Sequence, residues 1–196
     1  MAFQLTRFVD VQNARALEPG GAFNSSLARS TRRCLTVNGQ SLSLDAGSAS
    51  YAAIDTGTTL VGGPADSISV LYAHIPRSEA FTGDSAGYHT YPCNTNVTVT
   101  MNFGKRIIVW PILNADLLLM QVSGNSCVGG FFPLDMSGTS APLWSIGDTF
   151  LKNVYSVFRA SPAAIGFAQL SSRATTRSMN GQLGSLPSPT SALWRL

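Results

Sequence analysis

Short apolar runs separated by turn residues dominate the chain from residue 35 to residue 170. "LTVNGQSLSL" predicts two strands joined at Asn38–Gly39, the kind of dipeptide most typical of a tight hairpin. "SYAAID", "NVTVTMNF" and "RIIVWPI" predict further strands, and "NVTVTMNF" has the period-two alternation of a half-buried one. The pattern therefore indicates a β-rich domain.

Helical spacing is confined to short pieces. In "ADSISVLYAHI" the apolar residues Ile68, Leu71, Tyr72 and Ile75 lie three or four apart after Pro64, which predicts one short helix. "NADLLLMQV" fits a helix or a strand equally well. "LWSIGDTFLKNVYSVFRASPAAIGFAQL" predicts a buried strand, a Gly-Asp turn, a short helical piece and two closing strands. The predicted fold class is all-β with minor short helices.

The two ends differ in texture from the middle. Residues 1–34 lack sustained alternation, and we expect an irregular lead-in there. Residues 171–196 are rich in Ser, Thr and Pro, a composition typical of disorder. The start lacks the apolar run of a signal peptide, and no segment has the 18 apolar residues of a membrane span. We expect one domain over residues 35–170, with no signal peptide and no membrane span in this chain.

The charge and the histidines argue against two classes of site. The formal net charge of +3 is made up of +3 in residues 1–33, +3 in residues 171–196 and −3 between them. A nucleic-acid surface needs cations gathered on a folded face, so nucleic acid is not an expected partner. His74 and His89 lie far apart without metal-ligand spacing, so we expect surface or structural roles for them and no metal or cofactor. Trp110 and Trp144 are expected in the core.

The cysteines and two sequons bear on the cellular compartment. A disulfide between Cys93 and Cys127 would close a loop around both middle strands and leave Cys34 over, whereas three buried thiols in a cytosolic protein are the alternative. "NSS" at Asn24 and "NVT" at Asn96 match the N-glycosylation sequon. These features favour secretion of the parent protein.

One carboxylate stands in an unusual setting. In "AAIDTGTTLVGGP", residues 52–64, Asp55 ends an apolar strand and is followed by Thr56, Gly57 and Thr58. Hydroxyl and backbone N–H donors would stabilise the ionised carboxylate, and a glycine lets a backbone N–H approach it. An ordinary turn after a strand is the alternative, and on the three letters Asp-Thr-Gly alone it is favoured.

The surroundings of Asp55 resemble the active-site strand and loop of pepsin-like aspartic proteases, in which an apolar pair precedes Asp-Thr-Gly and Gly-Pro follows before a helix. Roughly ninety residues later, "LWSIGDTFLKNVYSVFRASPAAIGFAQL" resembles the family's other marker, and Ile146 and Gly147 match the apolar-Gly element that threads beside the catalytic loop. The likeness covers residues 35–170 and is strongest to fungal members. It implies the carboxy-terminal one of two β lobes, whose disulfide would be Cys93–Cys127.

The resemblance also implies roles around the carboxylate. Asp55 would be one of two catalytic carboxylates, and Thr56 would hydrogen-bond across to the other lobe. Gly57 would offer its N–H to the carboxylate, and Thr58 would bond its outer oxygen.

Further roles concern the substrate cleft. Ala53 and Ser145 match positions that line it and, with Thr58, would bind substrate, although Ser145 is polar where an apolar residue is common. We expect Asp148 to have a hydrogen-bonding role.

What matches is half an enzyme. The chain has a single Asp-Thr-Gly and no Asp-Ser-Gly, yet this hydrolysis needs one carboxylate as base and a second, protonated one as acid. We therefore expect an aspartic-type endopeptidase that is inactive alone and needs either its first lobe or a second copy of the chain. The alternatives are a self-complementing homodimer and a non-catalytic peptide-binding lobe. The chain would then be a truncated product or a fragment of a secreted or vacuolar protease that acts on peptides or proteins.

Overall fold

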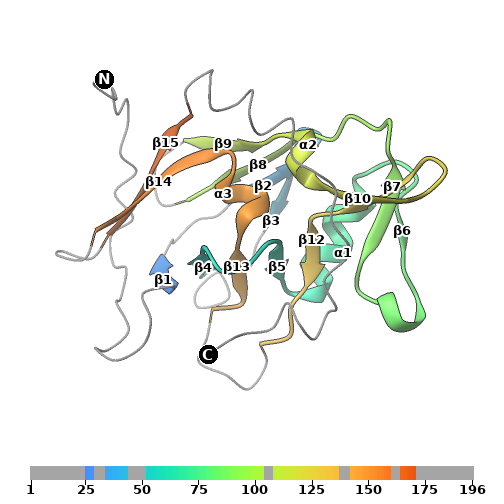
Figure 1. The fold of residues 1–196 in the computed structure, drawn as a ribbon, viewed down its shortest axis with the longest axis horizontal. Coiled ribbons are helices and arrows are strands. Elements are labelled where there is room, and N and C mark those ends of the chain that lie inside the picture. Colours follow the sequence, from blue (N-terminus) through green and yellow to red (C-terminus); the bar gives the residue numbers. More distant parts are fainter. Residues whose placement is uncertain are drawn as a thin grey trace.

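The computed structural model describes residues 25–28, 34–43, 52–103, 108–136, 142–159 and 164–170. Most of this part is strand, with short helices between (Figure 1). The strands are β1 (Ser25–Ala28), β2 (Cys34–Val37), β3 (Gln40–Ser43), β4 (Ala52–Asp55), β5 (Val61–Gly63), β6 (Glu79–Ala80), β7 (His89–Pro92), β8 (Val99–Asn102), β9 (Val109–Ile112), β10 (Leu118–Ser123), β11 (Ser126–Gly129), β12 (Phe131–Pro133), β13 (Trp144–Ile146), β14 (Val154–Arg159) and β15 (Ala164–Gln169). The helices are α1 (Ala65–Ala73), the 3-10 turn η2 (Gly83–Ser85), α2 (Asn114–Leu117) and α3 (Asp148–Leu151).

The predicted hairpin is confirmed as β2 and β3. Asn38 and Gly39 both have positive φ, 50° and 79°, which is the backbone that a two-residue hairpin turn requires. β2 also pairs with β8, and β8 with β9, so the sheet runs in the order β3-β2-β8-β9. The strands expected from "NVTVTMNF" and "RIIVWPI" are β8 and β9 of this sheet.

The helical predictions are confirmed as well. α1 buries Ile68, Leu71 and Tyr72, three of the four positions given by the sequence spacing; the fourth, Ile75, is buried just after the helix ends at Ala73. The ambiguous segment "NADLLLMQV" contains both structures, because α2 ends at Leu117 and β10 begins at the next residue.

A five-stranded sheet in the order β1-β4-β13-β5-β12 forms the centre of the structure. β13 is parallel to β4 and antiparallel to β5, although it comes about ninety residues later in the chain. In Figure 1 these three strands lie between the β14–β15 hairpin on one side and α1 with β12 on the other. The sheet therefore brings the two sequence markers next to each other.

The core covers one face of this central sheet. Ala52, Ile54, Trp144 and Ile146 belong to the main apolar cluster, and Trp144 is 2% exposed. A Cβ on Gly63 would lie only 2.5 Å from the Trp144 ring, which explains the glycine there. Trp110 is also buried in this cluster, so the prediction that both tryptophans are core residues is confirmed.

The all-β prediction with short helices is confirmed for the described residues. β1 lies within residues 1–34, where an irregular lead-in was expected. The rest of that lead-in up to residue 33, the side chain of Cys34, the sequon at Asn24 and the tail 171–196 lie outside the described residues. Among the helices described, none is long and apolar enough to cross a membrane.

Candidate active site

Asp55 is the last residue of β4, and its side chain is 7% exposed. The backbone N–H of Gly57 donates to its Oδ1 at 2.8 Å, and the hydroxyl of Thr58 donates to its Oδ2 at 2.6 Å. These are the contacts that the resemblance implies for the two residues. Each carboxylate oxygen is thus held by a donor from its own loop, in a site that excludes most solvent.

A second segment threads past this loop and fixes it. The backbone N–H groups of residues 147, 148 and 149 donate to the carbonyls of residues 60, 58 and 59 at 3.1, 2.9 and 2.9 Å. A Cβ on Gly147 would overlap the Thr58 carbonyl oxygen and would lie 2.6 Å from the Leu60 carbonyl oxygen. Only a glycine fits here, because the two backbones touch.

Thr149, which is not among the residues predicted for the site, completes this connection. Its side chain is 4% exposed, and its hydroxyl donates to the Thr59 carbonyl at 3.2 Å. The same side chain would lie 2.8 Å from a Cβ at Gly130. The only available signal was its place directly after Ile146-Gly147-Asp148 in the second marker.

Asp148 is electrostatically linked to Asp55. Burial raises the pKa of the Asp148 carboxyl, nearby Lys152 lowers it, and the negative charge of Asp55 raises it further. Its backbone N–H donates to the Thr58 carbonyl, and it begins α3. The Asp55 carboxylate is thus one of the causes that raise the pKa of Asp148, after burial.

Ala53 and Ser145 lie side by side on the same sheet. They are in register between β4 and β13, and they are 6% and 4% exposed. Ala53 and Asp55 are two residues apart on β4, so their side chains are on the same face of the sheet. Ala53 and its neighbour Ser145 therefore lie on the face that carries the carboxylate, about 7 Å along the strand from it. The Ser145 hydroxyl is buried and has no hydrogen-bond partner in the described part of the chain. The structure thus brings Ala53 and Ser145, two of the three candidate substrate-binding residues, to the Asp55 face.

Thr56 is different from its neighbours. It is exposed, and its side chain makes no hydrogen bond to any described residue. Its hydroxyl is therefore available to a group outside the described residues, whereas Thr58 is already bound to Asp55.

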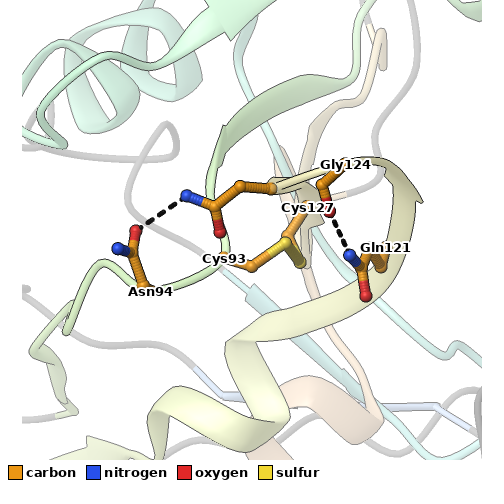
Figure 2. The surroundings of a disulfide bond; sticks show 6 residues. Cys93, Asn94, Gln121, Gly124 and Cys127 are labelled. Carbon is orange, nitrogen blue, oxygen red and sulfur yellow. Dashed lines mark hydrogen bonds between the residues drawn. A yellow bond between two sulfur atoms is a disulfide. The ribbon is translucent and has the colours of Figure 1, made fainter.

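The disulfide between Cys93 and Cys127 is present, so this prediction is confirmed (Figure 2). It joins the residue after β7 to β11, next to a hydrogen bond from the Cys93 N–H to the Asn125 carbonyl at 2.9 Å. On one side Asn125 donates to Asn94 at 3.0 Å, and on the other Gln121 donates to the carbonyl of Gly124 (Figure 2). The alternative of three free thiols is excluded.

The histidines have structural surroundings. His89 stacks on Tyr72 with ring centroids 4.2 Å apart, and burial lowers the pKa of its imidazole. His74 directly follows α1, and its Nδ1 lies 2.7 Å from the carbonyl oxygen of Val70, one turn earlier in that helix. Among the described residues, no three His, Cys, Asp or Glu side chains gather in a group that could hold a metal ion.

Known proteins match the same part of the chain. Residues 24–170 match the family model described as eukaryotic aspartyl protease. "Major aspartyl peptidase 1" of Cryptococcus neoformans var. grubii is 43% identical over 143 residues, which are 69% of this chain and 29% of that protein. "Aspartic protease" of Phaffia rhodozyma is 37% identical over 69% of this chain and 32% of its own length. "Pepsin A" of Bos taurus is 31% identical over 68% of this chain and 34% of its own length.

The family-model match begins at residue 24, before residue 35 where the likeness was expected to start, and so includes β1. The chain spans about a third of the length of the relatives it matches. Together with the strand order, the matches confirm a pepsin-like fold of the size of a single lobe.

Proposed function

The chain belongs to the eukaryotic aspartyl protease family, and we propose that it supplies one catalytic carboxylate, Asp55, to an aspartic endopeptidase. The observation that carries the proposal is the hydrogen bonding of both Asp55 oxygens at the point where β4 and β13 meet. A carboxylate held by donors from its own loop is fixed in position before substrate arrives, which favours catalysis. An ordinary turn would need no second segment threaded against it.

The proposed reaction is hydrolysis of a peptide bond by an activated water. One carboxylate takes a proton from the water while a second, protonated one donates to the carbonyl oxygen of the substrate. Two carboxyl groups that share a proton divide these tasks. Asp55 would be one member of the pair, and a chain with one such loop would be inactive alone.

The second carboxylate would come from the first lobe of a longer protease. The chain covers about a third of its relatives, and the Thr56 hydroxyl, which makes no hydrogen bond to a described residue, would bond across to another loop. A second copy of the same chain, which would provide another Asp55, is the alternative source, and a non-catalytic peptide-binding lobe is a third possibility. The test below distinguishes the three.

The substrate would be a peptide in extended form, lying along the sheet face that carries Asp55. Ala53, Thr58 and Ser145 are proposed to contact it, since they lie on or next to that face. The parent protease would be secreted or vacuolar, in agreement with the Cys93–Cys127 disulfide, because such bonds persist in oxidising compartments.

The experiment is cleavage of a quenched fluorescent peptide at acidic pH by the full chain, alone and refolded with the separately produced amino-terminal lobe of the Cryptococcus relative. Asp55→Asn removes the candidate carboxylate. Asp66→Asn is the matched control, because Asp66 is an exposed residue in the first turn of α1. Sedimentation gives the oligomeric state in each sample, and binding of a pepstatin-type inhibitor reports an assembled pair of carboxylates.

The proposal expects activity and inhibitor binding only in the two-lobe sample, lost in Asp55→Asn and kept in Asp66→Asn. Activity of the chain alone as a dimer would instead favour a second copy as partner. Proteolysis that survives Asp55→Asn would overturn every catalytic version. A folded two-lobe complex without activity or inhibitor binding would leave the peptide-binding lobe as the better description.

A further inference from the structure

Among the asparagines that the structure describes, almost all use their side chains to hold the backbone or each other. In the described part, hydrogen bonds are made by the amides of Asn38, Asn94, Asn102, Asn114, Asn125 and Asn153. Asn96 is exposed and makes none with a described residue. The one described asparagine whose side chain makes no hydrogen bond to a described residue is therefore also the asparagine of the sequon "NVT".

The segment that carries Asn96 is nevertheless well fixed. The backbone N–H of Val97 donates to the Asn114 side chain at 3.1 Å, and that of Thr98 donates to the Asn38 side chain at 3.0 Å. The Asn38 N–H donates back to the Thr98 carbonyl at 2.8 Å. Val97 is 1% exposed, whereas Asn96 and Thr98 on either side of it are exposed. Val97, the central residue of the sequon, thus holds the segment in the core, whereas the side chains of Asn96 and Thr98, which the transferase recognises, are exposed.

We propose that Asn96 is a site of N-linked glycosylation. An oligosaccharide is bulky and hydrophilic, so it is tolerated only where the side chain is exposed and has no partner to lose. Asn96 meets both conditions within the described part of the chain, since it is exposed and makes no hydrogen bond to a described residue. The loop between β7 and β8 would then carry a glycan three residues after Cys93, on the connection that the disulfide joins to β11.

The modification is a group transfer from a lipid-linked pyrophosphate oligosaccharide. The Asn96 Nδ2 forms a bond to the anomeric carbon of the first sugar, and the bond from that carbon to the pyrophosphate oxygen breaks. The lipid pyrophosphate leaves with the electron pair, and the amide loses one proton to a base of the transferase. The inference rests on the proposed entry into the secretory pathway and not on the catalytic proposal.

The test is translation of the full chain behind a cleavable leader in the presence of microsomes, with analysis of the chains that resist added protease. All variants carry Asn24→Gln, so that the other sequon cannot contribute. Asn96→Gln and Thr98→Ala remove the acceptor and the hydroxyl, and Thr98→Ser keeps the hydroxyl. Asn94→Gln is the matched control, since Asn94 is an exposed asparagine two residues away outside the sequon.

We expect one mobility step, removed by peptide-N-glycosidase, in the Asn24→Gln background and in the Asn94→Gln and Thr98→Ser variants. The step should be absent from Asn96→Gln and Thr98→Ala. Protease-resistant chains that lack the step in the Asn24→Gln background would overturn the proposal, and so would a step that persists in Asn96→Gln. No peptidase activity is read, so failure here leaves the catalytic proposal untouched.

Discussion

Gly147→Ala should be the most destabilising glycine-to-alanine change near the candidate active site. The backbone at Gly147 is extended, with φ −103° and ψ −157°, so alanine meets no conformational barrier there. The cost comes from the new Cβ, which would overlap the Thr58 carbonyl oxygen and lie 2.6 Å from that of Leu60. Both oxygens belong to backbone, so the two segments must move apart.

The magnitude follows from the hydrogen bonds that this movement breaks. The N–H of Gly147 donates to Leu60 at 3.1 Å, and that of Asp148 donates to Thr58 at 2.9 Å. A buried polar group left without its partner costs roughly 1–3 kcal/mol. Loss of both bonds predicts a destabilisation of about 2–6 kcal/mol, which is a large part of the stability of a typical domain.

The assay is urea unfolding of the full chain followed by tryptophan fluorescence, since Trp144 lies on the same strand as Ile146. Gly39→Ala is the control. It has open space around the added Cβ but a φ of +79°, so it should lose only about 1–2 kcal/mol. If Gly147→Ala proves no more destabilising than Gly39→Ala, the close contact between the two segments is not what holds the site together.

Three further changes test other parts of the structure. Asp148→Asn should become more stable relative to the parent as pH rises from about 3 to 6. The raised pKa of Asp148 means that the parent loses stability when this carboxyl ionises, whereas the asparagine stays neutral. A difference in urea midpoint that does not change with pH would contradict this. Replacing both Cys93 and Cys127 by Ser should lower the free energy of unfolding in urea by about 3–4 kcal/mol, because the disulfide closes a loop with a sequence separation of 34 and so restricts the unfolded chain. Unchanged stability would refute this value. Ser145→Ala should leave stability unchanged or raise it, since the buried hydroxyl has no described partner, and a loss above about 1 kcal/mol would reveal one.

The elements that the sequence predicted correctly are those specified by neighbouring residues. Asn38–Gly39 defines its hairpin because both residues accept positive φ. Likewise, the spacing of Ile68, Leu71 and Tyr72 defines the buried side of α1. In both cases the signal lies within one turn or one helix, so no distant contact is needed to interpret it.

The elements that were missed or left open depend on distant partners. β1 shows no alternation in sequence, and it is a strand because Ser25 to Ala28 pair in register with Asp55 to Ala52. "NADLLLMQV" changes from helix to strand at Leu118, where pairing with β11 begins. Tyr72 both donates to the Phe131 carbonyl and accepts from its N–H, across 59 residues of chain. No local pattern contains these contacts.

The candidate site combines the two kinds of information. Both donors to Asp55 come from residues two and three positions later, so its hydrogen bonding is encoded within Asp-Thr-Gly-Thr. The placing of that loop depends on Gly147 and Thr149, more than eighty residues away. Gly57→Ala, whose added Cβ would lie 3.3 Å from the Asp55 Oδ1, should therefore disturb the carboxylate with little loss of stability. Gly147→Ala should instead lower the stability of the fold, because it separates the segment that holds the loop against the sheet. If the two changes gave the same ratio of lost stability to lost inhibitor binding in the two-lobe sample, the local and the distant contributions would not be separable.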